Sequence, residues 1–424
     1  MGHVAVGGVM PGLGSEDGLR NALVDRLVAA GALRDGRVAQ SFGTVPRHLF
    51  LPGVPPERAY RDEAVPTKWG PDGRPVSSSS QPAVMAMMLE QLDVRRGQRV
   101  LEVGAGTGYN AALLAALVGP SGEVTTVDLD EDLVGQARSN LAAAGVDGVR
   151  VVCADGAGGW PDRAPYDRII LTVGAWDLAP AWTEQLAAGG RLLLPLSLRG
   201  VQRSVAFEPA ADHLSSVSVL PCGFMLLRGA MAGPEPRRPL GPGSGVFLEF
   251  DGERRLDVGA LYAALGQPGD LVLTGVHVTA DEVIDGLALS LALHEPDAGR
   301  LYAAGATADR DLVPPLLTAP GMAATGVLVG ERVLAALVRP SQHPDQHTEH
   351  TARSGAFQLG VRAFGVGGGE LTGRLVDAVR RWDAGGRPAT AGMRIRAYPA
   401  GSALEGDGAA LLDKHYTRLL LDWP

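Results

Sequence analysis

Three glycines at alternate positions come directly after a short apolar run. The run is residues 100–103, and the glycines are Gly104, Gly106 and Gly108. Glycine adopts positive φ without strain and lets a ligand approach the backbone closely, so this spacing predicts a tight turn that holds a ligand. Asp128 lies twenty residues beyond Gly108, at the end of a second apolar run. A carboxylate in that position can accept hydrogen bonds from ribose hydroxyls.

A second polar group precedes a predicted helix. Ser78, Ser79 and Ser80 stand in succession before Gln81 and Pro82. Proline is favoured in the first turn of a helix, where an N–H has no intrahelical partner. Hydroxyl and backbone donors at such a helix start favour an anion. The run therefore predicts a carboxylate site, and the alternative is a capped loop without a ligand.

The elements that must position these groups are predicted by alternating patterns. Strand-like and helix-like segments succeed one another from residue 99 onward, which indicates βαβ units and a parallel, doubly wound sheet of the α/β class. The polar, Pro-rich stretch 53–75 is expected to be a surface loop. We expect strands at 100–103, 124–127, 149–153, 169–173 and 191–195, and helices at 15–32, 110–118, 131–144 and 180–188.

Two cofactors use such a turn, and the glycine spacing distinguishes them. A dinucleotide fingerprint would place its third glycine at the position of Tyr109, so a nicotinamide oxidoreductase is disfavoured. The observed pattern, preceded by Glu102, resembles motif I of class I methyltransferases, and the resemblance implies S-adenosylmethionine as cofactor and S-adenosylhomocysteine as product. It also implies these cofactor contacts: Glu102, Gly104, Ala105, Gly106, Thr107, Gly108, Asp128, Leu129, Asp155 and Gly156.

Five short segments around the glycine turn occur in a characteristic order. They are Val45-Pro-Arg-His-Leu-Phe50, Ala59-Tyr60-x-Asp62, Ser80-Gln81-Pro82, Gln185-Leu186 and Gly189-Gly190. Through them the sequence resembles the protein L-isoaspartyl O-methyltransferases, over about residues 19–228. The resemblance implies that Ser80 occupies the position of the family's functional serine, with Ser79 and Ser78 beside it as further candidate catalytic residues.

The sequence also departs from the family pattern. Ser78 and Ser79 replace the usual Thr-Ile, the segment 68–75 is longer, and a second domain follows. These departures resemble the long actinobacterial relatives associated with ribosomal peptide maturation. That resemblance implies methylation of a normal aspartate in a constrained precursor peptide, followed by closure to an aspartimide. The expected substrate contacts are Trp69, Arg74, Gln81, Val173 and Trp176.

Two alternatives to this function stay open. The first is repair of L-isoaspartyl residues, which has the same cofactor and fold but a different acceptor. The second is a cofactor-binding scaffold without catalysis. The predicted division is a methyltransferase domain over 1–228, a linker over the Pro- and Gly-rich residues 229–245, and an α/β or α+β accessory domain over 246–424 that binds the peptide.

Composition limits the partners and the location. A net charge of −9 gives no basic excess for a nucleic acid. The two cysteines, of which Cys153 is expected in the core, exclude a disulfide framework. No apolar run is long enough for a membrane span, and the expected location is cytoplasmic. His343, His347 and His350 are close in sequence, but Pro344 interrupts them, so a polar loop is preferred to a zinc site and no metal is expected.

Overall fold

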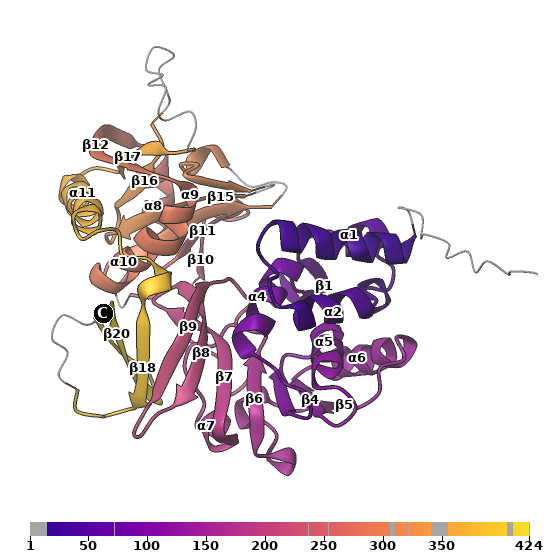
Figure 1. Cartoon of the computed structure of the whole chain (residues 1–424). Helices are drawn as coiled ribbons and strands as arrows, with labels where there is room; N and C mark the ends of the chain where they lie inside the picture. Colours follow the sequence, from indigo (N-terminus) through magenta and orange to yellow (C-terminus); the bar gives the residue numbers. More distant parts are fainter. Residues whose placement is uncertain are drawn as a thin grey trace, which may run out of the picture. The chain divides into compact units, whose positions relative to one another are not determined.

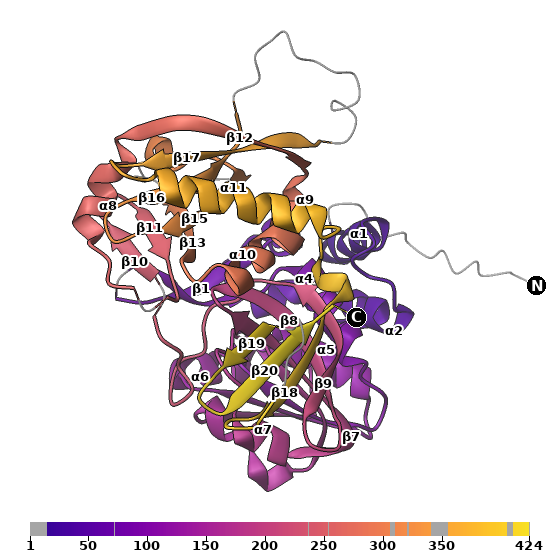
Figure 2. The same cartoon turned by 90° about the vertical axis from the view of Figure 1, so that its left-hand side faces the viewer.

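The computed structural model describes residues 15–71, 73–235, 237–252, 254–305, 310–319, 322–340, 355–404 and 410–423. The chain divides into two compact units. The first unit comprises Met1–Pro195, Ser204–Ser218 and Cys222–Ala232, and the second comprises Leu196–Arg203, Val219–Pro221 and Gly233–Pro424. Figures 1 and 2 show their elements from two directions.

The first unit is built on a parallel sheet with the order β7-β6-β3-β4-β5. Because the chain runs outward from β3 in both directions, β3 is the point at which the strand order reverses. Ligands bind at such a point, outside the carboxyl ends of the strands. The strands are β3 (Arg99–Val103), β4 (Glu123–Asp128), β5 (Val149–Cys153), β6 (Tyr166–Leu171) and β7 (Leu186–Leu198), followed by β8 (Val201–Pro209) and β9 (Leu214–Pro221).

Helices α5 and α6 pack on β4 and β5, and one apolar cluster joins these helices to α1, α2 and α4. The predicted helix at 180–188 ends early, at Glu184, because residue 186 already begins β7. The helical segments of this unit are α1 (Glu16–Ala29), α2 (Gly36–Thr44), η1 (Arg47–Phe50), α3 (Pro56–Ala59), α4 (Pro82–Leu92), α5 (Tyr109–Val118), α6 (Glu131–Ala143), η2 (Gly156–Gly158), η3 (Pro161–Arg163) and α7 (Pro180–Glu184).

The prediction of a loop over 53–75 is wrong. This stretch contains α3 and the strand β1 (Val65–Trp69), which pairs antiparallel with β2 (Pro75–Ser79). The turn between the strands is closed by hydrogen bonds from Gly70 N to the Arg74 carbonyl and from Gly73 N to the Gly70 carbonyl. Proline is tolerated here because β1 and β2 form a two-stranded sheet, so each strand is an edge strand.

The second unit contains an antiparallel sheet with the order β10-β11-β13-β15-β16-β17-β12. Of the two predicted classes, α+β therefore describes it. Helix α11 packs on β12, β16 and β17. Its segments are β10 (Arg237–Leu240), β11 (Val246–Glu249), α8 (Val258–Leu265), β12 (Pro268–Val278), α9 (Ala280–Glu282), η4 (Val283–Leu287), α10 (Ala288–His294), β13 (Ala298–Ala304), η5 (Arg310–Leu312), β14 (Leu317–Ala319), β15 (Met322–Val329), β16 (Leu334–Val338), β17 (Phe357–Phe364), α11 (Gly369–Ala384), η6 (Thr390–Gly392), β18 (Arg394–Pro399), β19 (Ala410–Asp413) and β20 (Thr417–Asp422).

Two further expectations are corrected. Cys153 is exposed instead of buried, because it is the last residue of the outer strand β5. The expected linker 229–245 contains β10, which pairs with β11 and buries Leu240.

The histidines 343, 347 and 350 lie outside the described residues. Among the described residues, no helix is long and apolar enough to cross a bilayer, and no cluster of His, Cys, Asp or Glu side chains is arranged to hold a metal ion.

Candidate active site

The glycine turn lies at the carboxyl end of β3 and has the conformation that its sequence predicts. Gly104, Gly106 and Gly108 all have positive φ, at 104°, 50° and 84°. A Cβ atom on Gly104 would lie 2.7 Å from Thr172 Oγ1, so no larger residue fits there. At Gly108 the atoms that a Cβ would meet belong to Ala137 of α6, at 3.3 Å. The lack of a side chain at Gly104 therefore keeps the turn clear of Thr172, and the lack of one at Gly108 lets α5 pack closely against α6.

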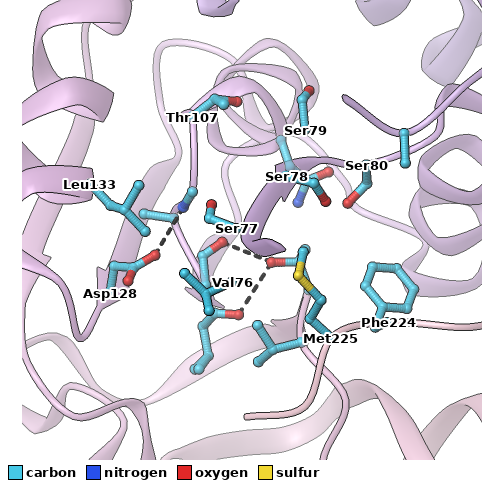
Figure 3. Close-up of a pocket in the computed structure, with 18 of the residues that line it drawn as sticks. Val76, Ser77, Ser78, Ser79, Ser80, Thr107, Asp128, Leu133, Phe224 and Met225 are labelled. Atoms are coloured by element: carbon cyan, nitrogen blue, oxygen red, sulfur yellow. Dashed lines mark hydrogen bonds between the residues drawn. The ribbon is translucent and has the colours of Figure 1, made fainter. Parts of the chain in front are cut away.

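Asp128 ends β4 directly beside this turn. Its Oδ2 accepts a hydrogen bond from Gly106 N at 2.9 Å, and its Oδ1 accepts one from Asp130 N at 3.2 Å. A carboxylate has about four lone-pair sites, so capacity remains for two ribose hydroxyls. Figure 3 shows Asp128 beside the turn, joined to it by the dashed hydrogen bond.

A cavity of about 370 Å³ opens between the glycine turn and the serine run. This volume lies within the range of small-molecule sites. Its wall includes Ala64, Pro66, Pro75, Gly156, Thr172 and Val173, and four segments far apart in the sequence form most of it. They are the end of β2 with the start of α4 (Val76, Ser77, Ser78, Ser79, Ser80, Gln81, Val84, Met85), the turn (Val103, Gly104, Ala105, Gly106, Thr107, Tyr109, Asn110), the end of β4 (Val127, Asp128, Leu129, Leu133) and the segment Gly223, Phe224, Met225, Leu226, Leu227, Arg228.

The serines do not all face the same way. Side chains alternate along a strand, so Ser78 lies on the opposite side of β2 from Ser77 and Ser79. The Ser79 hydroxyl is buried and makes no hydrogen bond in the structure. In Figure 3 it points away from Phe224 and Met225, whereas Ser80 points toward the cavity. Ser80 and Ser78 are therefore the better placed of the three predicted catalytic residues.

Asp62 organises the start of α4. Its Oδ1 accepts a hydrogen bond from Ala83 N at 2.8 Å, and its Oδ2 accepts one from Gln81 Nε2 at 3.0 Å. Pro82 has no N–H, so the first free donor expected at this helix start is already occupied by a protein carboxylate. Side-chain hydroxyls are left as the main donors to an acceptor anion.

Behind the turn lies a buried carboxyl group that the sequence places in the cofactor site. Glu102 is fully buried and does not line the cavity. It accepts hydrogen bonds from Asn110 Nδ2 at 2.7 Å and from Thr126 Oγ1 at 2.6 Å. Burial raises the pKa of the Glu102 carboxyl to about 7. The structure thus places Glu102 as the residue that orients Asn110, and Asn110 itself lines the cavity.

A family model described as protein-L-isoaspartate(D-aspartate) O-methyltransferase (PCMT) matches residues 18–230. The chain belongs to this family. A relative named protein-L-isoaspartate O-methyltransferase, from Methanopyrus kandleri, is 43% identical over 194 residues, which cover 46% of this chain and 83% of the relative. A second relative of the same name, from Hyperthermus butylicus, is 39% identical over 219 residues, covering 50% of this chain and 88% of the relative.

Two solved structures resemble the chain more distantly. One is titled as a protein-L-isoaspartate O-methyltransferase and covers 89% of this chain and 96% of its own, with 21% identity and a TM-score of 0.48. The other is a putative protein-L-isoaspartate O-methyltransferase from Plasmodium falciparum in complex with S-adenosyl-L-homocysteine. It covers 49% of this chain and 98% of its own, with 19% identity and a TM-score of 0.44.

Family membership confirms two predictions. The chain is an O-methyltransferase of aspartyl or isoaspartyl carboxylates, and its cofactor is S-adenosylmethionine. The strand order β5-β4-β3-β6-β7 confirms the Rossmann-like fold of class I methyltransferases. The family model ends at residue 230, so the antiparallel sheet of the second unit lies outside the matched region.

The PCMT cavity is closed by a segment that the sequence analysis missed. Residues 223–228 supply apolar walls and are held by hydrogen bonds from Gly174 N to the Met225 carbonyl and from Leu227 N to the Gly174 carbonyl, both 2.8 Å long. Asp155 fastens the end of this segment, since its Oδ2 accepts a hydrogen bond from Ala230 N at 2.8 Å. Its Oδ1 accepts one from Ala157 N, and its side chain does not line the cavity.

The remaining predicted contacts divide into two groups. Gln81 and Val173 of the expected substrate set line the PCMT cavity, as do Leu129 and Gly156 of the expected cofactor set. Trp69, Arg74 and Trp176 do not line it. Trp69 is 57% exposed at the end of β1, where the hairpin turn begins. Its contact with a peptide stays a prediction.

Four charged side chains form salt bridges that join the hairpin to the walls of the cavity. Lys68 Nζ of β1 lies 2.8 Å from Asp130 Oδ2 and 2.6 Å from Asp132 Oδ1. Arg228 Nη2 lies 2.7 Å from the same Asp130 oxygen. The hydrogen bond from Arg228 is the main cause that lowers the pKa of the Asp130 carboxyl. Asp130 thus connects β1 and the 223–228 segment at the start of α6.

Proposed function

We propose that this PCMT enzyme methylates the side-chain carboxylate of an aspartyl residue in a constrained, ribosomally made peptide, and that the ester then closes to an aspartimide. The observation that carries the proposal is the serine-lined wall opposite the glycine turn. Ser78 and Ser79 stand where the family usually has Thr-Ile, so this wall carries smaller side chains than in the repair enzymes, and Ser80 and Ser78 supply its hydroxyls. Together with the longer segment 68–75 and the second domain, this departure resembles the long actinobacterial relatives associated with ribosomal peptide maturation.

The residues of the cavity meet the needs of this reaction. When bound, S-adenosylmethionine supplies an electrophilic methyl group. An aspartyl carboxylate is ionised at neutral pH, so the chain needs no general base. Ser80 and Ser78 donate hydrogen bonds that orient the carboxylate. Phe224, Met225 and Met85 exclude water that would otherwise solvate the anion and weaken it as a nucleophile.

Closure to the aspartimide needs only the peptide. The backbone nitrogen that follows the methylated residue attacks the ester carbonyl, and a C–N bond forms as the C–O bond to methoxide breaks. The amide proton leaves with methoxide as methanol. Methoxide is a far better leaving group than the oxide that an unmethylated carboxylate would have to expel, so methylation is the step that the enzyme must provide.

The second unit is proposed to recognise the peptide. The family model stops at residue 230, so the residues from about 246 onward are an addition to the methyltransferase part. A pull-down of the full chain with the precursor peptide checks this assignment. If the part of the precursor outside the modified segment adds no affinity for the full chain, the assignment is contradicted.

A second candidate acceptor is L-isoaspartate in a damaged protein. It is favoured by the relatives at 36–43% identity, which carry the name protein-L-isoaspartate O-methyltransferase. Cofactor, fold and serine wall are the same in both readings. The difference lies in one methylene group, which is in the side chain of aspartate and in the main chain of isoaspartate.

One assay separates the two acceptors. The enzyme is incubated with methyl-labelled S-adenosylmethionine and matched peptides that carry aspartate or isoaspartate, each linear or cyclised, and the masses are followed. We expect a methyl gain and then loss of methanol on the cyclised aspartyl peptide. Turnover on isoaspartate alone would favour repair, and cofactor binding without turnover would point to a scaffold.

A further inference from the structure

Arg47 is a buried cation directly behind the acceptor side of the cavity. Its side chain is fully buried, at 0% exposure, in the segment η1. Its Nε donates a hydrogen bond to the Ala59 carbonyl at 2.8 Å, and its Nη2 donates one to the Ser80 carbonyl at 3.0 Å. Its Cζ lies 5.0 Å from the centre of the Tyr109 ring, a cation–π distance.

No acid forms a salt bridge with Arg47 within the described part of the chain, although the more distant carboxylate of Asp62, at the start of α4, interacts with its charge. The salt bridges found there include none to Arg47, and the third nitrogen, Nη1, has only the Met85 sulfur at 3.9 Å. A buried charge is costly unless it is paired, so an unpaired guanidinium that is retained at full burial calls for an explanation. Two carbonyls, a ring face and the more distant Asp62 stabilise the cation, but no carboxylate pairs with it directly.

The position of that charge points to its use. Ser80, Met85 and Tyr109, the three residues that Arg47 contacts on this side, all line the cavity. Among the described lining residues, Arg228 is the only cation, and Asp130 already holds it. An acceptor carboxylate at Ser80 would therefore have Arg47, one residue layer away, as its nearest available positive charge.

We propose that Arg47 is a positioning residue that supplies the positive charge beneath Ser80 and thereby binds the acceptor carboxylate as an anion. The proposal rests on the proposed function, because it presupposes a carboxylate acceptor. The same side chain holds the Ser80 carbonyl, so charge and hydroxyl are presented together. A charge in a water-poor interior acts over a longer distance than one in solvent.

The reaction gives this role a kinetic signature. The acceptor oxygen is negative before methyl transfer and uncharged in the ester, so Arg47 attracts the bound substrate more than the transition state. Loss of the charge should therefore weaken acceptor binding without slowing the chemical step. A residue that merely supports the fold would lower kcat or the amount of active enzyme and leave KM unchanged.

The variants are Arg47→Met and Arg47→Lys, assayed in the full chain with the better of the two acceptor peptides. We expect KM for the peptide to rise on the order of tenfold in R47M, with kcat within about threefold of the unaltered enzyme. R47K keeps the charge and should recover most of the lost affinity. The affinity for S-adenosylhomocysteine should stay unchanged in both.

Arg168 provides a matched control in the same unit. It is also a buried arginine, and its guanidinium donates to the main-chain carbonyls of Leu92, Asp93 and Asp167. Unlike Arg47, Arg168 donates only to residues that do not line the cavity, and it does not line the cavity itself. R168M should lower stability and leave KM for the peptide unchanged.

A binding measurement keeps the inference testable if R47M does not fold. In the presence of S-adenosylhomocysteine, the unaltered enzyme should bind an aspartyl peptide about tenfold more tightly than the same peptide with asparagine. Equal binding of the two peptides, or an unchanged KM in folded R47M, would overturn the role of Arg47. The proposed function would still be supported in that case if the unaltered enzyme methylates the peptide. Absence of methylation on every carboxyl peptide would overturn both.

Discussion

The Glu102 carboxyl shows how a single buried group couples the site to pH. It lies fully buried under the glycine turn, and burial is the main cause that raises its pKa to about 7, while hydrogen bonds from Thr126 and Asn110 act in the opposite direction. Between about pH 4.5 and 7 the folded chain keeps this proton and the unfolded chain loses it. The free energy of unfolding therefore falls as pH rises through this window, by up to about 3 kcal/mol.

Glu102→Gln should remove this decline. Glutamine is uncharged at every pH and retains an oxygen that accepts from Asn110, so the curve of stability against pH should become flatter between pH 5 and 7. Urea unfolding at pH 5, 6 and 7 measures the difference, with the exposed Glu184→Gln as control. Parallel curves for E102Q and the unaltered chain would show that Glu102 is ionised in the folded state at these pH values.

At the scale of elements, the hairpin β1–β2 and the segment 223–228 are held together at Asp130. Each of its two ion pairs is partly exposed, with the Lys68 and Arg228 side chains at 29% and 44%, so each contributes about 0.5–1 kcal/mol. Both segments form walls of the cofactor cavity. Asp130→Asn should therefore weaken binding of S-adenosylhomocysteine, by about three- to tenfold.

Asp132→Asn is the matched control, because among the described residues Asp132 forms a salt bridge with Lys68 and none with Arg228, and its side chain is 65% exposed. Calorimetric titration of the two variants with S-adenosylhomocysteine compares them directly. We expect the change for D132N to stay within about twofold. An equal loss of affinity in both variants would mean that general charge, and not the link through Asp130, sets the affinity.

The predictions of secondary structure are correct where one physical requirement, such as burial or positive φ, determines both the residue type and the local structure. Buried parallel strands need continuous apolar runs, and the glycines at 104, 106 and 108 need positive φ, so both could be read from residue types. The hairpin was missed because its strands carry Pro66 and Pro75, which edge strands tolerate but which sequence reasoning treats as breakers. Pairing with a distant partner is not visible in a local pattern.

The candidate site was predicted only in part for a related reason. Asp128 and the serines have reactive groups, and the structure brings both to the cavity. Phe224 and Met225 have none, and only the tertiary contact of their segment with Gly174 places them there. Asp155 was assigned to the cofactor from its position after β5, but its two oxygens bind Ala157 and Ala230.

At the scale of the whole molecule, the two compact units differ in construction. The first has the parallel sheet and the complete cavity, whose lining residues all belong to it. The second has an antiparallel sheet with apolar clusters on its strands and on α10 and α11. The sequence predicts strands of this sheet at 246–250, 271–278 and 326–329, but none at β13, β16 or β17. Alternation in antiparallel strands is weak when both faces are covered, as in the fully buried β16, which explains the omission.

This division predicts which backbone amides cofactor binding will protect from hydrogen exchange. S-adenosylhomocysteine at 100 times its Kd stabilises the state that binds it by about 2.7 kcal/mol, so amides that exchange by opening of the cavity should slow about 100-fold. Hydrogen exchange followed by mass spectrometry should show this protection in peptides that cover residues 103–110, 127–133 and 223–228. Peptides from β12 and β17 serve as the internal reference, because these strands contribute no residue to the cavity wall. Protection confined to β12 and β17 would place the cofactor in the second unit and contradict the site described above.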